Sequence, residues 1–253
     1  MRRARFLRDR GERGVAFVEG VRLLEEALRA DVPIEETFVT LEAERRNPLL
    51  LDRLRARGVT VRILDEGLLS QLSELETSEG VVALARRPPF DEAQVLAGIP
   101  LVVVLCGIQN PGNVGALLRT AEASGATGAL LTRGSADPFS WKALRGSMGS
   151  AFRLPHVFVA DGWDAAERLK AKGVRLVGAA RNAPHAYDAL DWKGGTALFL
   201  GNEGAGLSDA ILGRMDLVVS VPMKDPVESL NVGAAAAVLL FEAARQRRGP
   251  PPR

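Results

Sequence analysis

The sequence predicts an α/β protein with a mainly parallel sheet, preceded by a second, smaller α/β unit. Short apolar segments alternate with helix-like segments, as in proteins whose parallel strands are covered by helices. The run PLVVVLC at residues 100–106 is apolar throughout, which is typical of a strand buried on both faces. The pair Pro88-Pro89 interrupts the pattern, because proline lacks an amide donor and restricts the residue before it. We therefore expect one unit on each side of this pair.

The first unit is expected to be a small domain over residues 1–88. Its pattern predicts a helix at 21–30, a strand at 36–40, a helix near 48–57, a strand at 59–64, a helix near 65–73 and a strand at 80–85. A unit of about 85 residues lies within the usual range of domain sizes. Residues 89–97 are predicted to be a linker.

The second unit is expected over residues 98–248. The strand at 100–106 precedes a helix at 114–124, a strand at 128–132, helices at 140–146 and 164–172, strands at 174–179, 196–200 and 217–221, and a helix at 230–247. The proline-rich tail at 249–253 is predicted to be disordered. Ligands of such sheets bind beyond the carboxyl ends of the strands.

Composition favours a cytoplasmic, metal-free globular protein. The 253 residues are 47% hydrophobic and 25% charged, and the longest apolar runs are too short to span a bilayer. The arginine-rich first residues are not followed by the apolar run of a secretory signal. One cysteine, Cys106, excludes an internal disulfide, and two histidines make a structural zinc site an unfavourable interpretation.

The distribution of charge gives a weak indication of nucleic-acid binding. The formal net charge is only +2, but arginines cluster at residues 2–5 and 245–248. Guanidinium groups suit two-pronged contacts with phosphate. Solvated termini in an arginine-biased composition explain the clusters equally well.

The first of three motifs is QNPGNVGALLRT at residues 109–120, a predicted strand-to-helix turn. Pro111 and Gly112 are expected to shape the turn, and Asn113 to cap the helix. Arg119 would then lie about one and a half turns into the helix, where it could hold a phosphate or a carboxylate of another chain. Taken alone, the motif favours a structural interpretation.

The second motif is LGNEGAGLS at residues 200–208. Three glycines around Asn202 and Glu203 leave backbone amides free to bind an anion or an adenosyl group. It is not the dinucleotide fingerprint, which places G-x-G-x-x-G after the first strand. Alone, it is also typical of an ordinary glycine turn with a solvated Glu203.

The third motif is VPMKDPVESLNV at residues 221–232, where a strand ends at a proline and a loop leads to the last helix. Ser229 is predicted to be the helix cap and Asn231 to form a hydrogen bond in the first turn. The positive end of the helix dipole would suit a carboxylate.

In this order and spacing the motifs resemble the SpoU family of RNA ribose 2′-O-methyltransferases, in the SPOUT superfamily, over residues 101–243. Residues 17–28 and 80–83 resemble the substrate-binding domain that many members carry, itself similar to an RNA-binding ribosomal protein, and LRGSMG at 144–149 resembles a small-residue segment of the family. The resemblance implies a C-terminal trefoil knot, a rare exception to the rule against knots. It also implies a homodimer and S-adenosyl-L-methionine held by the knot loops.

The resemblance assigns roles to individual residues. The positions implied to be catalytic are Arg119, Asn113, Glu203, Ser229 and Asn231. The positions implied to bind the cofactor are Leu200, Gly201, Asn202, Gly204, Val221, Pro222, Met223 and Leu230. Arg22 and Arg145 are predicted to contact RNA. The chain departs from the family pattern at Asp225 (usually Gly), Gly233 (often Ser) and Asn110 (often Asp).

The predicted function is S-adenosylmethionine-dependent methylation of a ribose 2′-hydroxyl in structured RNA, with ribosomal RNA favoured over transfer RNA. A guanidinium stays protonated, so Arg119 is expected to grip a phosphate and stabilise alkoxide charge rather than act as a base. The other four residues would orient Arg119 and the ribose. Two alternatives stay open: a non-catalytic RNA-binding or ribosome-assembly protein, and a nucleotide-dependent oxidoreductase, which the missing fingerprint disfavours.

Overall fold

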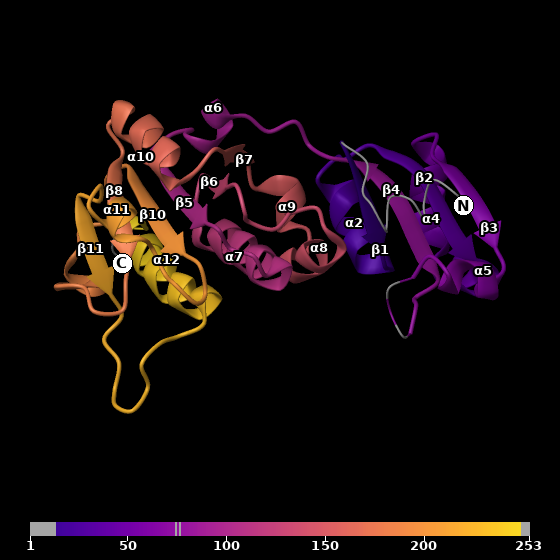
Figure 1. Cartoon of the computed structure of the whole chain (residues 1–253). Helices are drawn as coiled ribbons and strands as arrows, with labels where there is room; N and C mark the ends of the chain where they lie inside the picture. The colour runs from indigo at the N-terminus through magenta and orange to yellow at the C-terminus, as the bar shows by residue number, and fades with distance from the viewer. Residues whose placement is uncertain (1–13, 74, 76, 249–253) are drawn as a thin grey trace, which may run out of the picture.

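The computed structural model describes residues 14–73, 75 and 77–248, which form two sheets with their helices (Figure 1). The predicted disordered tail and the arginines at 2–5 lie outside the described residues. The N-terminal sheet has the order β1-β4-β2-β3, with β4 antiparallel to both neighbours and β3 parallel to β2. Its elements are β1 (Val15–Glu19), α2 (Val21–Arg29), β2 (Ile34–Thr40), α3 (Leu41–Arg46), α4 (Pro48–Ala56), β3 (Thr60–Leu64), α5 (Glu66–Ser70) and β4 (Val81–Arg86).

The C-terminal sheet has seven strands in the order β7-β6-β5-β10-β8-β11-β9, and every neighbouring pair is parallel. Its strands are β5 (Leu101–Cys106), β6 (Gly128–Thr132), β7 (His156–Val159), β8 (Arg175–Ala179), β9 (His185–Ala186), β10 (Thr196–Gly201) and β11 (Leu217–Ser220). Its helices are α6 (Glu92–Val95), α7 (Pro111–Ser124), α8 (Trp141–Ser147), α9 (Ser150–Arg153), α10 (Gly162–Ala171), η1 (Tyr187–Ala189), α11 (Asp209–Leu212) and α12 (Val232–Arg247). The predicted α/β class, the mainly parallel sheet and an N-terminal domain are confirmed.

Strand β5 shows why its sequence is apolar at every position. Val102 and Val104 pack in the core cluster that contains the buried residues of α10, whereas Val103 and Leu105 pack with buried residues of α7 and α12. The strand is thus covered on both faces, and the carboxyl end of the sheet stays open for ligands.

The two predicted helix caps are wrong. Helix α7 begins at Pro111, and its cap is Asn110, whose Oδ1 accepts a hydrogen bond from the Gly112 amide at 2.8 Å. Proline suits the first helical position, so it is part of the helix rather than of the turn before it. Helix α12 begins at Val232, and its cap is Asn231, not Ser229. In both cases an Asn amide oxygen next to the helix provides the acceptor.

Strands β1, β7 and β9 were not predicted. Strand β7 has only four residues, too few for a period to be visible, and β1 precedes the first predicted helix directly. The segment predicted as a linker contains the short helix α6, which Asp91 and Gln94 begin with a capping box.

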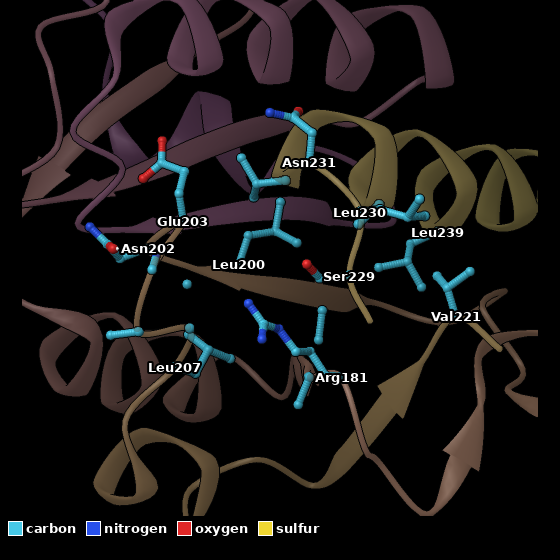
Figure 2. Close-up of a pocket in the computed structure, with 18 of the residues that line it drawn as sticks. Arg181, Leu200, Asn202, Glu203, Leu207, Val221, Ser229, Leu230, Asn231 and Leu239 are labelled. Carbon is cyan, nitrogen blue, oxygen red and sulfur yellow. Dashed lines mark hydrogen bonds between the residues drawn. The ribbon is translucent and has the colours of Figure 1, made fainter. Parts of the chain in front are cut away.

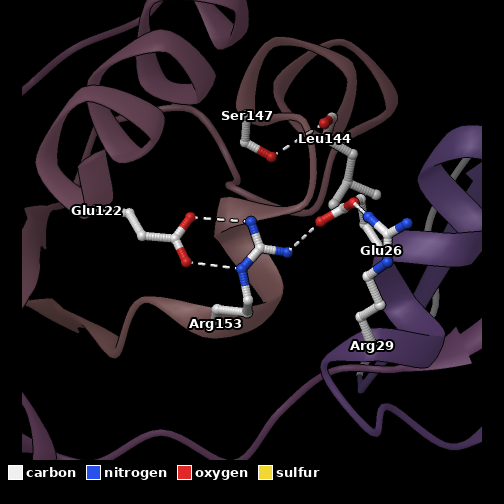
Figure 3. A network of polar contacts seen from close by, with 6 residues as sticks. All are labelled: Glu26, Arg29, Glu122, Leu144, Ser147 and Arg153. Carbon is white, nitrogen blue, oxygen red and sulfur yellow. Dashed lines mark hydrogen bonds and ion pairs between the residues drawn. The ribbon is translucent and has the colours of Figure 1, made fainter.

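The N-terminal domain packs against the C-terminal domain through β1 and α2. Trp141 Nε1, at the start of α8, donates a hydrogen bond to Glu19 Oε2 at 2.8 Å. Arg153 contacts Glu26 of α2 as well as Glu122 of α7 (Figure 3). A Cβ on Gly149 would lie 2.5 Å from the Glu26 Cβ, so the approach of α2 requires glycine there. These contacts hold the two domains together.

Acidification should destabilise the protein through His156. This side chain is buried, its Nδ1 lies 2.9 Å from the Leu154 carbonyl oxygen, and burial lowers its pKa below the ordinary value of 6.5. The unfolded chain takes up the proton first as pH falls, so stability is fully present above the ordinary pKa and is lost below it. We expect the free energy of unfolding, measured in urea, to fall as the pH decreases through about 6.5, the ordinary pKa of histidine.

The variant His156→Phe should show a weaker pH dependence, because its unfolded state no longer gains that proton. His185→Phe, which removes the other histidine, provides the control and should behave as wild type. An unchanged slope in His156→Phe would contradict this interpretation.

Candidate active site

The second motif forms a tight turn where β10 ends. Asn202 holds it from both sides: its Nδ2 donates to the Gly107 carbonyl at 3.0 Å, and its Oδ1 accepts from the Gly204 amide at 2.9 Å. The Gly206 amide donates to the Asn202 carbonyl at 2.8 Å. A Cβ on Gly201 would overlap the backbone of Gly206 and Leu207. The turn therefore depends on glycine at 201 and is tied to the end of β5.

A chain of side-chain hydrogen bonds joins the three motifs. Asn113 Nδ2, in the first turn of α7, donates to Glu203 Oε1 at 2.7 Å. Asn231 Nδ2 donates to Asn113 Oδ1 at 3.3 Å, and Asn231 Oδ1 caps α12 by accepting from the Gly233 amide at 2.9 Å. The structure thus brings together three of the five residues predicted to be catalytic.

A cavity of about 400 Å³ opens beside this chain (Figure 2). Its floor is apolar, with Leu200, Val219 and Leu239, and its rim carries Glu203, Ser229 and Asn231. Seven of the eight residues predicted to bind the cofactor line it: Leu200, Gly201, Asn202, Gly204, Val221, Met223 and Leu230. Pro222 and Asp225 are not among its lining residues. The carboxyl ends of β8, β10 and β11 therefore form one ligand-sized site.

Arg181 is a lining residue that motif analysis missed. It follows β8, which no motif contains, and Figure 2 shows its guanidinium directed between Leu207 and Ser229. Of the lining residues that the structure describes, it is the one cation. The one signal in the sequence is its position, two residues after the predicted strand at 174–179, where ligands of a parallel sheet bind.

Arg119 does not line this cavity. It lies two turns into α7 and borders a second cavity of about 350 Å³ at the contact between the domains, together with Arg22. Arg145, the other residue predicted to bind RNA, places its guanidinium carbon 4.9 Å from the centre of the Trp141 ring. The predicted group of five is thus divided between two places on the protomer.

The departures from the family pattern leave the cavity intact. Asn110 keeps the acceptor that caps α7, and Asp225 lies in an exposed part of the loop before α12. A Cβ on Gly233 would lie 3.2 Å from Asn231 Oδ1, so glycine there gives the capping amide room.

Comparison with known proteins identifies the family. Residues 100–241 match the family model described as SpoU rRNA Methylase family, and residues 17–90 match RNA 2′-O ribose methyltransferase substrate binding. The chain belongs to the SpoU rRNA methylase family. The resemblance inferred from the three motifs is thereby confirmed.

Individual SpoU relatives cover almost the whole chain. The chain is 34% identical over 234 residues to the 23S rRNA (guanosine(2553)-2′-O)-methyltransferase RlmP of Bacillus subtilis, covering 92% of this chain and 90% of that protein. It is 34% identical over 221 residues to the 23S rRNA (guanosine-2′-O-)-methyltransferase RlmB of Xanthomonas campestris, covering 83% and 89%. The SpoU methyltransferase AviRb from Streptomyces viridochromogenes, in complex with AdoMet, superposes with a TM-score of 0.86 at 30% identity, covering 98% and 97%.

The cavity fits the methyl donor of SpoU enzymes. Its volume lies in the range of small-molecule sites, and it combines apolar walls with polar groups at the rim. The turn at 200–207 brings backbone close to the cavity without side chains from Gly201, Gly204 and Gly206. This arrangement suits S-adenosyl-L-methionine, which has an apolar adenosyl face and polar edges.

Residues 14–73, 75 and 77–248 contain no group of three or more His, Cys, Asp or Glu placed to hold a metal ion. None of the described helices is long and apolar enough to cross a bilayer. Burial raises the pKa of Cys106 to about 12, so it stays a thiol at neutral pH and is a poor nucleophile.

Proposed function

We propose that this protein transfers a methyl group from S-adenosyl-L-methionine to a ribose 2′-hydroxyl of ribosomal RNA. The observation that carries the proposal is the cavity at the ends of β8, β10 and β11, bordered by the hydrogen-bonded chain Asn231–Asn113–Glu203. Relatives at 34% identity are named for 2′-O-methylation of guanosine in 23S rRNA, which favours ribosomal over transfer RNA.

The residues of this chain hold the cofactor and the ribose in place rather than acting as a strong base. The bound cofactor provides an already electrophilic methyl group. The buried Leu200 and Leu239 make the cavity floor apolar, and the hydrogen bonds among Asn113, Glu203 and Asn231 fix polar groups at its rim. Ser229, also at the rim, can donate or accept a hydrogen bond to the ribose. The remaining tasks are to remove the proton of the 2′-hydroxyl and to align its oxygen with the methyl group.

Arg119 supplies the positive charge of the reaction centre. Its guanidinium binds the phosphate next to the target ribose and stabilises the developing alkoxide, while phosphate or water accepts the proton. Because Arg119 lies outside the cavity of its own protomer, we propose that a second copy completes the centre. Helix α12 offers an apolar stripe for that contact, with Ala234, Val238 and the half-exposed Phe241 on one face.

We propose the finer organisation of the chain on the same basis. A trefoil knot at the C-terminal end is supported by the loop at 221–231, which lies with the turn at 200–207 around one cavity. Domain limits at 1–88, 89–97 and 98–248 are supported by the two separate sheets and by the two family matches. A cytoplasmic location follows from an rRNA substrate.

The test is transfer of tritiated methyl groups to unmodified 23S and 16S ribosomal RNA and to bulk transfer RNA, followed by mapping of alkali-resistant dinucleotides. We expect label in a 2′-O-methyl nucleotide of ribosomal RNA. Cofactor binding by calorimetry without methyl transfer to any RNA would contradict the proposal. RNA binding without cofactor binding would instead support a non-catalytic RNA-binding protein.

Asn113→Ala should reduce kcat/KM by about 10- to 100-fold, because Glu203 loses a charged hydrogen bond and Asn231 loses its partner. Steady-state kinetics with ribosomal RNA measures this. Asn110→Asp is the matched control in the same turn: a carboxylate can still cap α7, so activity should not change. Equal activity of Asn113→Ala and wild type would exclude the hydrogen-bonded chain from the reaction.

A further inference from the structure

A second cavity, of about 350 Å³, lies where the two domains meet. Arg22 and Glu26 of α2 line it from the N-terminal domain, and Arg119 and Glu122 of α7 line it from the C-terminal domain. Arg153 lies between them. The cavity is therefore shared by the domain that resembles a substrate-binding module and the helix that carries the proposed catalytic arginine.

Both carboxylates that line this cavity already form ion pairs with arginine. Arg153 donates to Glu122 through Nε at 2.6 Å and Nη2 at 2.9 Å, and to Glu26 Oε2 through Nη1 at 2.6 Å (Figure 3). Arg29 also pairs with Glu26. Each acidic group of the cavity thus has at least one arginine partner.

Arg22 and Arg119 also line the cavity, and they take no part in these pairs. Among the described residues neither of them has a hydrogen-bond or ion-pair partner. The lining residues within the described part of the chain comprise three arginines against two glutamates, an excess of one positive charge. Two free guanidinium groups at one cavity form a site for an anion with several acceptor oxygens.

The geometry around the two arginines is fixed rather than loose. The Arg153 bridge ties α2 to α7, and α2 packs closely at Glu26 against Gly149, in the turn that precedes α9. Met148, which also lines the cavity, has a left-handed backbone with φ of 50°, a strained conformation that clusters at binding sites. The paired residues therefore hold the domains while the unpaired arginines stay available.

We propose that one backbone phosphate of the RNA substrate binds between Arg22 and Arg119. This rests on the proposed function and deepens it: the N-terminal domain would bind the RNA and, through Arg22, also help to place the strand beside the reaction centre. Arg22 is then a positioning residue for the target nucleotide. RNA phosphate fits better than a small anion, because the substrate-binding domain and the catalytic helix each contribute one cation.

The test uses the full-length protein with 23S rRNA transcribed in vitro. Arg22→Ala should raise the KM for RNA about tenfold, with kcat changed less than about twofold and the cofactor dissociation constant unchanged. The slope of log affinity against log salt should fall by about one. Arg22→Lys should restore most of the salt slope and only part of the affinity.

Arg53→Ala is the matched control, since it removes an exposed arginine from α4 of the same domain, away from the cavity. Arg119→Ala and the double variant complete a cycle in RNA binding. A phosphate shared by both arginines predicts that the double variant binds more tightly than the sum of the single losses implies. Additive losses, or a salt slope in Arg22→Ala equal to that in Arg53→Ala, would overturn the proposal.

Two further measurements separate the possible failures. The melting temperature of Arg22→Ala should match wild type, because the side chain is exposed and unpaired. If wild type fails to methylate any RNA, the proposed function fails. If wild type methylates 23S rRNA but the Arg22 variants bind it normally, only the shared phosphate site is wrong.

Discussion

Arg119→Ala should lower kcat for methyl transfer by at least about 10²-fold, the loss typical when one charge-stabilising donor is removed from a reaction centre. The cofactor dissociation constant should stay within a few-fold of wild type, because Arg119 lies outside the 400 Å³ cavity. Single-turnover kinetics and calorimetry measure the two quantities separately. Near-normal turnover in Arg119→Ala would eliminate the proposed mechanism.

Arg119→Lys distinguishes charge from geometry. A lysine keeps the charge but offers no planar fork, so substantial activity in this variant would favour a role for charge alone. Little activity would favour two-pronged phosphate binding. In either case the melting temperature should not change, because the side chain is exposed and without an ion pair among the described residues.

Mixing of inactive variants tests whether a second copy supplies Arg119. Arg119→Ala keeps an intact cavity, and Gly201→Ala keeps an intact Arg119. If the arginine acts on the cavity of the other protomer, mixed dimers have one working centre, and mixtures should recover up to about a quarter of wild-type activity. No recovery, with mixed dimers shown by mass spectrometry, would place both residues in one protomer.

Gly201→Ala should abolish measurable cofactor binding. The new Cβ would overlap the backbone of Gly206 and Leu207, and backbone cannot move aside as a flexible side chain can. The turn would have to open, which separates Asn202 from the amides that it holds and deforms the cavity wall. We expect a loss of at least about 100-fold in affinity, corresponding to about 3 kcal/mol, within the usual range for overpacking.

Gly204→Ala is the matched control in the same turn. Its Cβ would meet only Asn202 Oδ1, at an ordinary 3.6 Å. Calorimetric titration with S-adenosyl-L-methionine should therefore show a much smaller loss than in Gly201→Ala. Comparable losses in the two variants would mean that any side chain in the turn blocks the cofactor, and that the backbone overlap is not the cause.

Local patterns in the sequence predicted several elements whose physical cause is local. The apolar run of β5 indicates burial on both faces, and the glycines of the second motif indicate a turn with exposed amides. The two Asn caps were missed because several nearby residues, among them Asn113 and Ser229, have suitable side chains. Only the backbone angles of the folded chain decide among them.

The arrangement of the site depends on contacts between distant segments, which a single sequence does not display. The bond between Asn113 and Glu203 joins residues 90 positions apart. Arg181 entered the cavity without belonging to a motif, and Arg119 stands apart from the residues grouped with it. The first two of these facts depend on the order of the strands in the sheet, where β10 lies directly between β5 and β8. Along the chain, four strands (β6, β7, β8 and β9) separate β5 from β10.

The bridge from Arg153 to Glu26 and Glu122 bears on chimeric enzymes. A substrate domain grafted from another rRNA methyltransferase would leave Arg153 without one of its two carboxylate partners. The exception is a donor with an acidic residue at the position of Glu26. The recipient domain already provides Gly149, and the helix of the graft that replaces α2 would have to pack closely against it. Retargeting this enzyme to a new RNA therefore requires a substrate domain that fits Arg153 and Gly149 as well as the new RNA.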